Sequence, residues 1–229
     1  MKQIAEARKQ KRSALDELAG KQLLAAYGVA VPQSVMVAGA NEAAQKTKSL
    51  KFPVVVKVMS PDILHKSDAG GVKVGLKSAA EVGSAIGTML QQPAIAAARI
   101  DGFLVEEMAP AGQEIVIGGL RDPQFGPLVM VGLGGIFVEV LADVSFRICP
   151  ITRLDAQEML AELKGAAILK GARGKKPVSQ EAIIDVLLKV GGEAGLLTQH
   201  ATDIKEADIN PLIVSESGAV AVDARFILS

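Results

Sequence analysis

The stretch Glu206-Ala-Asp-Ile-Asn-Pro-Leu212 and the run Val220-Ala-Val-Asp223 that follows it carry the most information about how this chain folds. Apolar and polar residues alternate in both runs, and residues 215–218 between them are rich in turn formers, so the pattern predicts a β-hairpin. Such a hairpin would bring Asn210 and Asp223 close together. Carboxylate and amide oxygens, together with phosphates, are the ligands that Mg²⁺ takes in nucleotide sites. The alternative is an edge hairpin whose polar residues are simply solvated.

A second informative segment, Phe52-Pro-Val-Val-Val-Lys57, is an apolar strand with a lysine set into it. Burying an ammonium group without a partner is costly, so Lys57 reaches a solvated edge, pairs with a carboxylate or meets an anion. The polar loop that follows ends in the pair Gly70-Gly71 and leads into another strand. Backbone amides in a glycine-rich turn can hold phosphate. The loop is not the P-loop pattern, because no Gly-Lys-Ser/Thr sequence opens a helix.

A third segment, Phe103-Leu-Val-Glu106-Glu107-Met108, is a strand that ends in two acids. A further strand follows over residues 113–118 and carries Glu114. These acids are either ordinary exposed charges or acceptors for the amino group of adenine and the hydroxyls of ribose, which donate hydrogen bonds.

Seven short stretches of the sequence, quoted below in chain order, give the chain a family resemblance. It resembles the ATP-grasp (beta) subunit of the ADP-forming acyl-CoA synthetases, such as ADP-forming acetate–CoA ligase, and more distantly the nucleotide-binding part of succinyl-CoA synthetase. Each stretch alone is weak, but the ordered set, from about residue 15 to the C-terminus, is specific. The stretches are Lys21-Gln-Leu-Leu-Ala-Ala-Tyr27-Gly28-Val29, Phe52-Pro-Val-Val-Val-Lys57, Ser60-Pro-Asp-Ile-Leu-His65-Lys66-Ser67-Asp68-Ala-Gly70-Gly71-Val72, Leu104-Val-Glu106-Glu107-Met108, Asp122-Pro-Gln-Phe125-Gly126-Pro127, Gly132-Leu-Gly134-Gly135 and Asp208-Ile-Asn210-Pro-Leu212.

The order of expected elements mixes helices and strands and predicts an α+β fold of two lobes. The resemblance implies the ATP-grasp fold, in which two α/β lobes clamp a nucleotide. The 229 residues suit a single domain, with lobes over approximately 13–105 and 106–229. Among the expected helices are one that stops at Gly28 and one from residue 179 to about residue 198. Their expected apolar faces are Leu15, Leu18, Gln22, Leu23 and Ala26 in the first, and Ile183, Val186, Leu187 and Val190 in the second.

Composition excludes several classes of protein. The net charge is zero and aromatic residues make up 3% of the chain, whereas nucleic-acid binders usually show a basic excess or stacking residues. The single cysteine, Cys149, rules out an intrachain disulfide and is expected to be a buried, inert thiol in a reducing cytoplasm. No apolar run approaches a membrane helix, and the charged N-terminal segment lacks the apolar region of a secretory signal.

The resemblance implies roles for particular residues. Lys57 matches a lysine that contacts nucleotide phosphates, with a structural salt bridge as the alternative. Residues 106–108 match the hinge that meets adenine, and Glu114 matches an acid near ribose and phosphates. Asn210 and Asp223 match the Mg²⁺ ligands. The residues expected to contact ATP or ADP are Lys57, Lys66, Ser67, Gly70, Gly71, Glu106, Glu107, Met108, Glu114, Gly134 and Gly135.

The two histidines are expected to differ. A lone histidine in a polar loop is usually surface decoration, but the resemblance implies that His65 carries phosphate between a partner subunit and ADP. Neutral imidazole is a good nucleophile near pH 7, and Lys57 and Lys66 could steady the phosphoryl charge. Asp208 lies where relatives carry an acid near the phosphohistidine; where they have Glu, its reach is one methylene shorter. His200 is expected at an exposed helix end, without chemistry.

The resemblance implies the overall reaction acid + CoA + ATP ⇌ acyl-CoA + ADP + phosphate. It places CoA binding on an alpha subunit or fused domain, so we expect this chain to be one part of a hetero-oligomer. Two alternatives stay open at this point. One is an ATP-grasp ligase with another acceptor, such as a carboxylate–amine ligase, which would not need His65. The other is a non-catalytic nucleotide sensor of the kind attached to a protein acetyltransferase.

Overall fold

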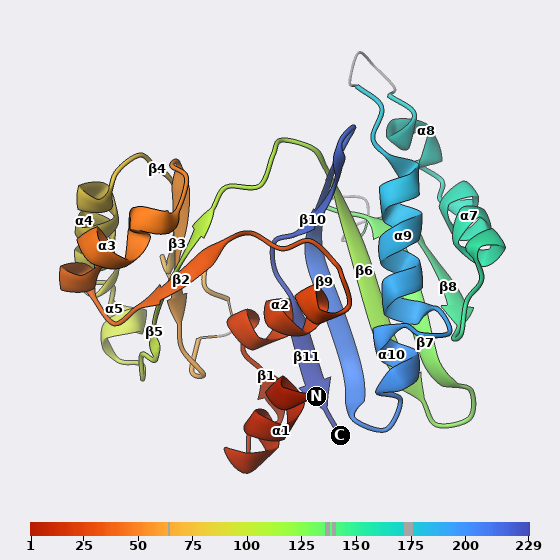
Figure 1. Ribbon diagram of the computed structural model, residues 1–229, viewed down its shortest axis with the longest axis horizontal. Coiled ribbons are helices and arrows are strands. Elements are labelled where there is room, and N and C mark those ends of the chain that lie inside the picture. The colour runs from red at the N-terminus through yellow and green to blue at the C-terminus, as the bar shows by residue number, and fades with distance from the viewer. Residues whose placement is uncertain (64, 136–137, 139–140, 172–175) are drawn as a thin grey trace. The chain divides into compact units, whose positions relative to one another are not determined.

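The computed structural model describes residues 1–63, 65–135, 138, 141–171 and 176–229 and divides into two compact units (Figure 1). The first unit comprises Met1–Val31 and Pro110–Ser229, and the second comprises Pro32–Ala109. This division differs from the expected lobes, because residues 13–31 join the C-terminal part of the chain. The reason is that strand β1 (Ala14–Leu15) pairs with β11 (Arg225–Leu228) near the C-terminus.

An antiparallel sheet of seven described strands forms the first unit, in the order β1-β11-β9-β6-β7-β8 with β10 also paired to β9. The strands not yet located are β6 (Gln113–Asp122), β7 (Gly126–Leu133), β8 (Val144–Ile148), β9 (Ile204–Ser215) and β10 (Gly218–Ala221). The predicted hairpin is therefore confirmed as β9 and β10, joined at residues 216–217.

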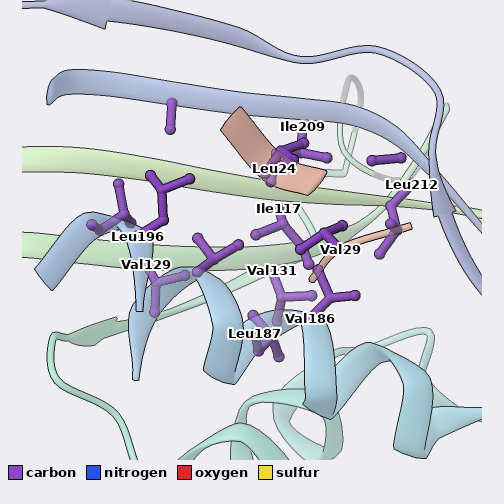
Figure 2. Packing of buried hydrophobic residues seen from close by; sticks show 14 of the residues in the cluster. Leu24, Val29, Ile117, Val129, Val131, Val186, Leu187, Leu196, Ile209 and Leu212 are labelled. Atoms are coloured by element: carbon purple, nitrogen blue, oxygen red, sulfur yellow. The ribbon is translucent and has the colours of Figure 1, made fainter. Parts of the chain in front are cut away.

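Helices cover one face of this sheet. They are α1 (Lys2–Lys9), α2 (Glu17–Ala26), α7 (Arg153–Glu162), α8 (Ala166–Leu169), α9 (Gln180–Gly191) and α10 (Leu196–Gln199). Figure 2 shows Val186 and Leu187 of α9 beside Val131 of β7 in the core. The long helix expected over residues 179–198 breaks into α9 and α10, because the chain turns at Gly192, where a Cβ atom would lie 2.5 Å from the Leu188 carbonyl oxygen.

The second unit is a four-stranded antiparallel sheet in the order β2-β5-β3-β4, with its own core. Its strands are β2 (Ser34–Val37), β3 (Val54–Met59), β4 (Val72–Leu76) and β5 (Gly102–Glu107), and its helices are α3 (Ala40–Lys46), η1 (Thr47–Ser49), α4 (Ala79–Met89) and α5 (Pro93–Ala96). Alternate residues of β3, namely Val54, Val56 and Val58, pack in this core. The residues between them, including Lys57, therefore lie on the other face of the sheet.

The mixture of helices and antiparallel sheets confirms the predicted α+β class. In the part of the chain that the structure describes, none of the helices has the length and apolar character needed to cross a bilayer. The glycine- and lysine-rich stretch over residues 165–177 contains α8, and its residues 172–175 lie outside the described residues.

Candidate functional site

In the second unit, Lys57 and Glu106 form an ion pair on the sheet face opposite the apolar core. The Lys57 Nζ atom lies 3.0 Å from Glu106 Oε2, and the two side chains are 9% and 0% exposed. They lie diagonally on adjacent strands, since Lys57 pairs in register with Leu104 and Glu106 pairs with Val55. The lysine therefore has the carboxylate partner that the sequence allowed for, and Glu106 is not an ordinary exposed charge.

The polar loop after β3 is held at both of its ends. The Asp62 carboxylate accepts a hydrogen bond from the Arg99 backbone N–H at 2.8 Å, and the Val58 N–H donates to the Gly71 carbonyl at 2.7 Å. A Cβ atom on Gly71 would lie 2.4 Å from Val58 Cγ1, so only glycine fits there. His65 lies exposed between these anchors.

Other residues expected to bind nucleotide lie in the same loop. Lys66 is half-buried, Ser67 is exposed, and the Gly70 N–H donates to the Ser67 carbonyl at 3.0 Å within a turn. Gly70 has a φ of 72°, a conformation that favours glycine. The loop thus brings His65, Lys66 and the glycine pair together within seven residues.

The expected adenine hinge begins where β5 ends. The Glu107 carboxylate accepts a hydrogen bond from the Lys51 N–H at 2.8 Å, and the Met108 N–H donates to the Pro53 carbonyl at 3.3 Å. The Met108 N–H is thus already used within the protein. Contact with a base edge then falls to other atoms of the segment, among them the 42% exposed Met108 side chain.

In the first unit, the register of the hairpin places Asp223 opposite Asn210. The Val222 N–H, just beyond β10, donates to the Pro211 carbonyl at 3.0 Å. Strand β11 then pairs with β9 in the same register from Asp208 onward. Asp223 therefore lies across from Asn210 at the point where the neighbour of β9 changes from β10 to β11.

Asp208 lies two residues before Asn210 on the same exposed side of β9. Although the residue keeps exposed surface, the protein atoms around the carboxyl desolvate it and raise the pKa of Asp208 above its usual value. The charge of Arg225, its register partner on β11, lowers that pKa by a smaller amount. The expected role of Asp208 beside a phosphohistidine stays a prediction.

Glu114 and the glycine pair lie side by side in the first unit. The Gly134 N–H donates to the Glu114 carbonyl at 2.8 Å, and a Cβ atom on Gly134 would lie 2.8 Å from Glu114 Cβ. Gly135 has a φ of 63°, in the left-handed region that favours glycine. The close approach of Gly134 and the positive φ of Gly135 explain why glycine occupies both positions of a tight turn. The exposed Glu114 lies against this turn.

The oxygen ligands fit a hard cation that shares its coordination with a nucleotide. In residues 1–63, 65–135, 138, 141–171 and 176–229, no cluster of three or more His, Cys, Asp or Glu side chains could hold a metal ion by itself. Mg²⁺ in nucleotide sites usually takes one or two protein oxygens and completes its shell with phosphates and water. The Asn210 amide on β9 and the Asp223 carboxylate, in the segment between β10 and β11, are ligand types that match that requirement.

The comparisons with known proteins decide the family. A family model described as an ATP-grasp domain matches residues 6–228. This chain is an ATP-grasp protein. The chain is 46% identical to the beta subunit of ADP-forming acetate–CoA ligase I of Pyrococcus furiosus, over 99% of this chain and 97% of that subunit. It is 44% identical to ADP-forming acetate–CoA ligase I of Archaeoglobus fulgidus, over 91% of this chain but 30% of that longer chain.

A solved structure supports the same assignment of the ATP-grasp fold. It is an acetyl-coenzyme A synthetase of Ca. Korarchaeum cryptofilum in complex with coenzyme A and Mg-AMPPCP, whose phosphohistidine segment points towards the nucleotide binding site. The match has a TM-score of 0.86 at 42% identity and covers 100% of this chain and 99% of that chain. The expected ATP-grasp fold and the resemblance to ADP-forming acyl-CoA synthetases are therefore confirmed.

The predictions for His200 and Cys149 had different outcomes. His200 was expected to be exposed, which is wrong: it is 9% exposed, its Nδ1 lies 3.1 Å from Asp203 Oδ2, and its ring meets Tyr27 edge to face. It follows the short helix α10 and packs against Tyr27, the residue after α2. Cys149 is buried as expected, and burial raises the pKa of its thiol to about 12, which keeps it protonated and unreactive.

One feature near the hairpin of β9 and β10 was not predicted from the sequence. Helix α2 buries Glu17 and Lys21, whose Oε1 and Nζ atoms are 2.9 Å apart. The available signal was an acid and a lysine four residues apart within an otherwise apolar helix. The predicted apolar face instead included Gln22 and Ala26, which the structure leaves exposed.

Proposed function

We propose that this chain is the nucleotide-binding subunit of an ADP-forming acyl-CoA synthetase. It passes a phosphoryl group between ATP or ADP and a histidine, within the reaction acid + CoA + ATP ⇌ acyl-CoA + ADP + phosphate. The similarity to named beta subunits along nearly the whole chain supports this assignment. The relatives are named as ligases of acetate and, in Nitrosopumilus maritimus, of 4-hydroxybutyrate. We therefore propose a carboxylic acid as the substrate class.

The single observation that carries the proposal is the register that sets Asp223 against Asn210. The side-chain oxygens of Asn210 and Asp223 would hold Mg²⁺, which when bound offsets the negative charge of the nucleotide phosphates. A hairpin with merely solvated polar residues would not require an amide and a carboxylate on facing positions. Glu114 and the turn at Gly134 line the same unit and contact the ribose and phosphates.

In the second unit, Lys57 binds a phosphate oxygen, and Glu106 keeps the lysine oriented. The amides around Gly70 and Gly71 cradle the phosphates, and residues 106–108 receive the adenine. His65, exposed at the loop, accepts the phosphoryl group. The bond between the γ-phosphorus and the bridging oxygen breaks, its electron pair leaves on ADP, and a bond to an imidazole nitrogen forms.

The rest of the reaction requires a CoA-binding partner. The chain matches 97% of separate beta subunits but 30% of longer single-chain relatives, which fits a complex with an alpha subunit or with a fused domain. We assign the complex to the cytoplasm, because the buried Cys149 thiol suits a reducing compartment.

The test of this function is to incubate the chain with γ-labelled ATP and Mg²⁺, with and without its CoA-binding partner, and to map acid-labile phosphate. The chain has two histidines, so label on this subunit falls on one of two peptides. We expect it on the His65 peptide and expect His65→Ala to remove it. An unlabelled chain that binds ATP would favour a nucleotide sensor, and full ligase turnover in His65→Ala would favour a ligase with another acceptor.

A further inference from the structure

Helix α2 of the first unit contains a buried pair of charges that the proposed function does not use. Lys21 and Glu17 are 2% and 5% exposed, and their Nζ and Oε1 atoms are 2.9 Å apart. Removing two charged groups from water is costly even when they pair, and an apolar pair of similar volume is often at least as stable. The pair is therefore poorly explained by stability alone.

Lys21 also reaches the chain just after β10. Its Nζ atom donates to the Val222 carbonyl at 3.3 Å, directly before Asp223 in the chain. One residue earlier on α2, Gly20 lets the helix approach closely, since a Cβ atom there would lie 2.7 Å from the Ala224 carbonyl oxygen. Helix α2 thus contacts the backbone on both sides of Asp223.

The hydrogen bonds around Val222 and Asp223 are of two kinds, some from the backbone and one from a side chain. The Val222 N–H donates to the Pro211 carbonyl at 3.0 Å, which is a backbone bond of the hairpin. The Asp223 carboxylate accepts a hydrogen bond from the Ala224 N–H at 2.7 Å, so the side chain bonds to the backbone of the next residue. The bond to the Val222 carbonyl comes from the Lys21 side chain, so a substitution can remove it while the backbone bonds stay in place.

We propose that Lys21 is a positioning residue for the metal site. Paired with Glu17, it fixes the Val222 carbonyl and thereby the direction in which Asp223 presents its carboxylate opposite Asn210. The inference rests on the proposed function, in which Asp223 is a metal ligand. Side chains that orient a metal ligand without binding the metal typically change metal affinity by about 10- to 100-fold when replaced.

The test uses the full chain with ADP and Mn²⁺, because Mn²⁺ bound to the protein is detected directly by water-proton relaxation. The main variant is Glu17→Gln/Lys21→Met, which removes both charges together and so leaves neither buried alone. We expect the Mn²⁺ concentration at half-saturation to rise about tenfold. ADP binding measured without metal should stay close to wild type.

A matched control is Lys189→Met. Lys189 donates to the Gly28 carbonyl at 2.8 Å in the same unit, so it is another lysine-to-carbonyl bond but not one at the hairpin. It should leave Mn²⁺ binding unchanged. If the double variant does not fold, Lys21→Arg replaces it in the test, since it keeps the positive charge but moves the hydrogen-bond donor. A smaller rise in the Mn²⁺ concentration at half-saturation then supports the proposal.

Two outcomes separate the inference from the function beneath it. Wild-type Mn²⁺ binding in the double variant, or in Lys21→Arg if the double variant does not fold, overturns the positioning role when Asp223→Asn still weakens Mn²⁺ binding. If Asp223→Asn also binds Mn²⁺ like wild type, the metal assignment itself is wrong, and the role of Lys21 falls with it.

Discussion

Lys57 Nζ lies 3.0 Å from Glu106 Oε2 on neighbouring strands of the second unit, with both side chains nearly removed from water. The pair joins two segments that are about fifty residues apart in the sequence. It orients the ammonium group that we assign to the nucleotide phosphates, so the same contact serves stability and binding.

Replacing Lys57 alone with Met should therefore destabilise the protein strongly. The Glu106 carboxylate would stay buried without its cation, which costs about 3–5 kcal/mol. Denaturant unfolding measures the loss. The double variant Lys57→Met/Glu106→Gln should recover much of the stability but not phosphoryl transfer, which should stay slower by orders of magnitude. Recovery of both would show that the pair is structural only.

The substitution Asp223→Asn should weaken the binding of Mg-nucleotide by about tenfold or more, because a neutral amide is a poorer ligand for Mg²⁺ than a carboxylate. Calorimetric titration with ADP, with and without Mg²⁺, isolates the effect of the metal. Glu216→Gln is the control, since this exposed residue lies in the turn of the same hairpin and pairs with a surface lysine, Lys176. Equal affinity of the Asp223 variant and wild type would refute the metal assignment.

The substitution Gly71→Ala should destabilise the second unit by about 1–3 kcal/mol, because the added methyl group overlaps Val58. It should also shift the loop that carries His65. Gly87→Ala in α4 is the matched control: beyond its chain neighbours and the backbone of its own helix, no described atom lies within 4 Å of its added Cβ, and alanine favours the helix by up to about 1 kcal/mol. Thermal unfolding compares the two. If Gly71→Ala were as stable as wild type, the close approach at β3 would not hold in solution.

Acid should remove the contribution of Glu162 to stability. Hydrogen bonds from Arg147 and Ser145 lower the pKa of Glu162 from 4.5 to about 2. Because the folded pKa lies below the unfolded one, this stabilisation is present above about pH 4.5 and disappears as the pH falls toward 2. Glu162→Gln should lower Tm at pH 7 but match wild type near pH 2. A difference in Tm that did not depend on pH would contradict the assignment.

Local patterns were enough for elements whose apolar residues repeat regularly. The face of α9 that contains Ile183, Val186, Leu187 and Val190 is buried as predicted. The alternation in residues 206–212 and the turn formers after it predicted the hairpin, whose register with β9 continues from β10 into β11. These features depend on residues close together in the chain, so the sequence contains their cause.

Features that join distant segments were not accessible in this way. The pairing of Lys57 with Glu106 depends on β3 lying beside β5, which no local pattern specifies. The apolar pattern also misplaced the buried face of α2, since Gly20 and Lys21 are buried for their contacts with the C-terminal segment rather than for hydrophobicity. His200 was misjudged for the same reason, because its partner Tyr27 lies at the other end of the sequence.

A crystal structure of this chain with Mg-AMPPCP tests the central claim most directly. We predict a metal ion about 2.0–2.1 Å from side-chain oxygens of Asn210 and Asp223, also bound to phosphate oxygens, with Lys57 in contact with the same nucleotide. Density for the nucleotide or metal at another place, with these three side chains untouched, would contradict the account.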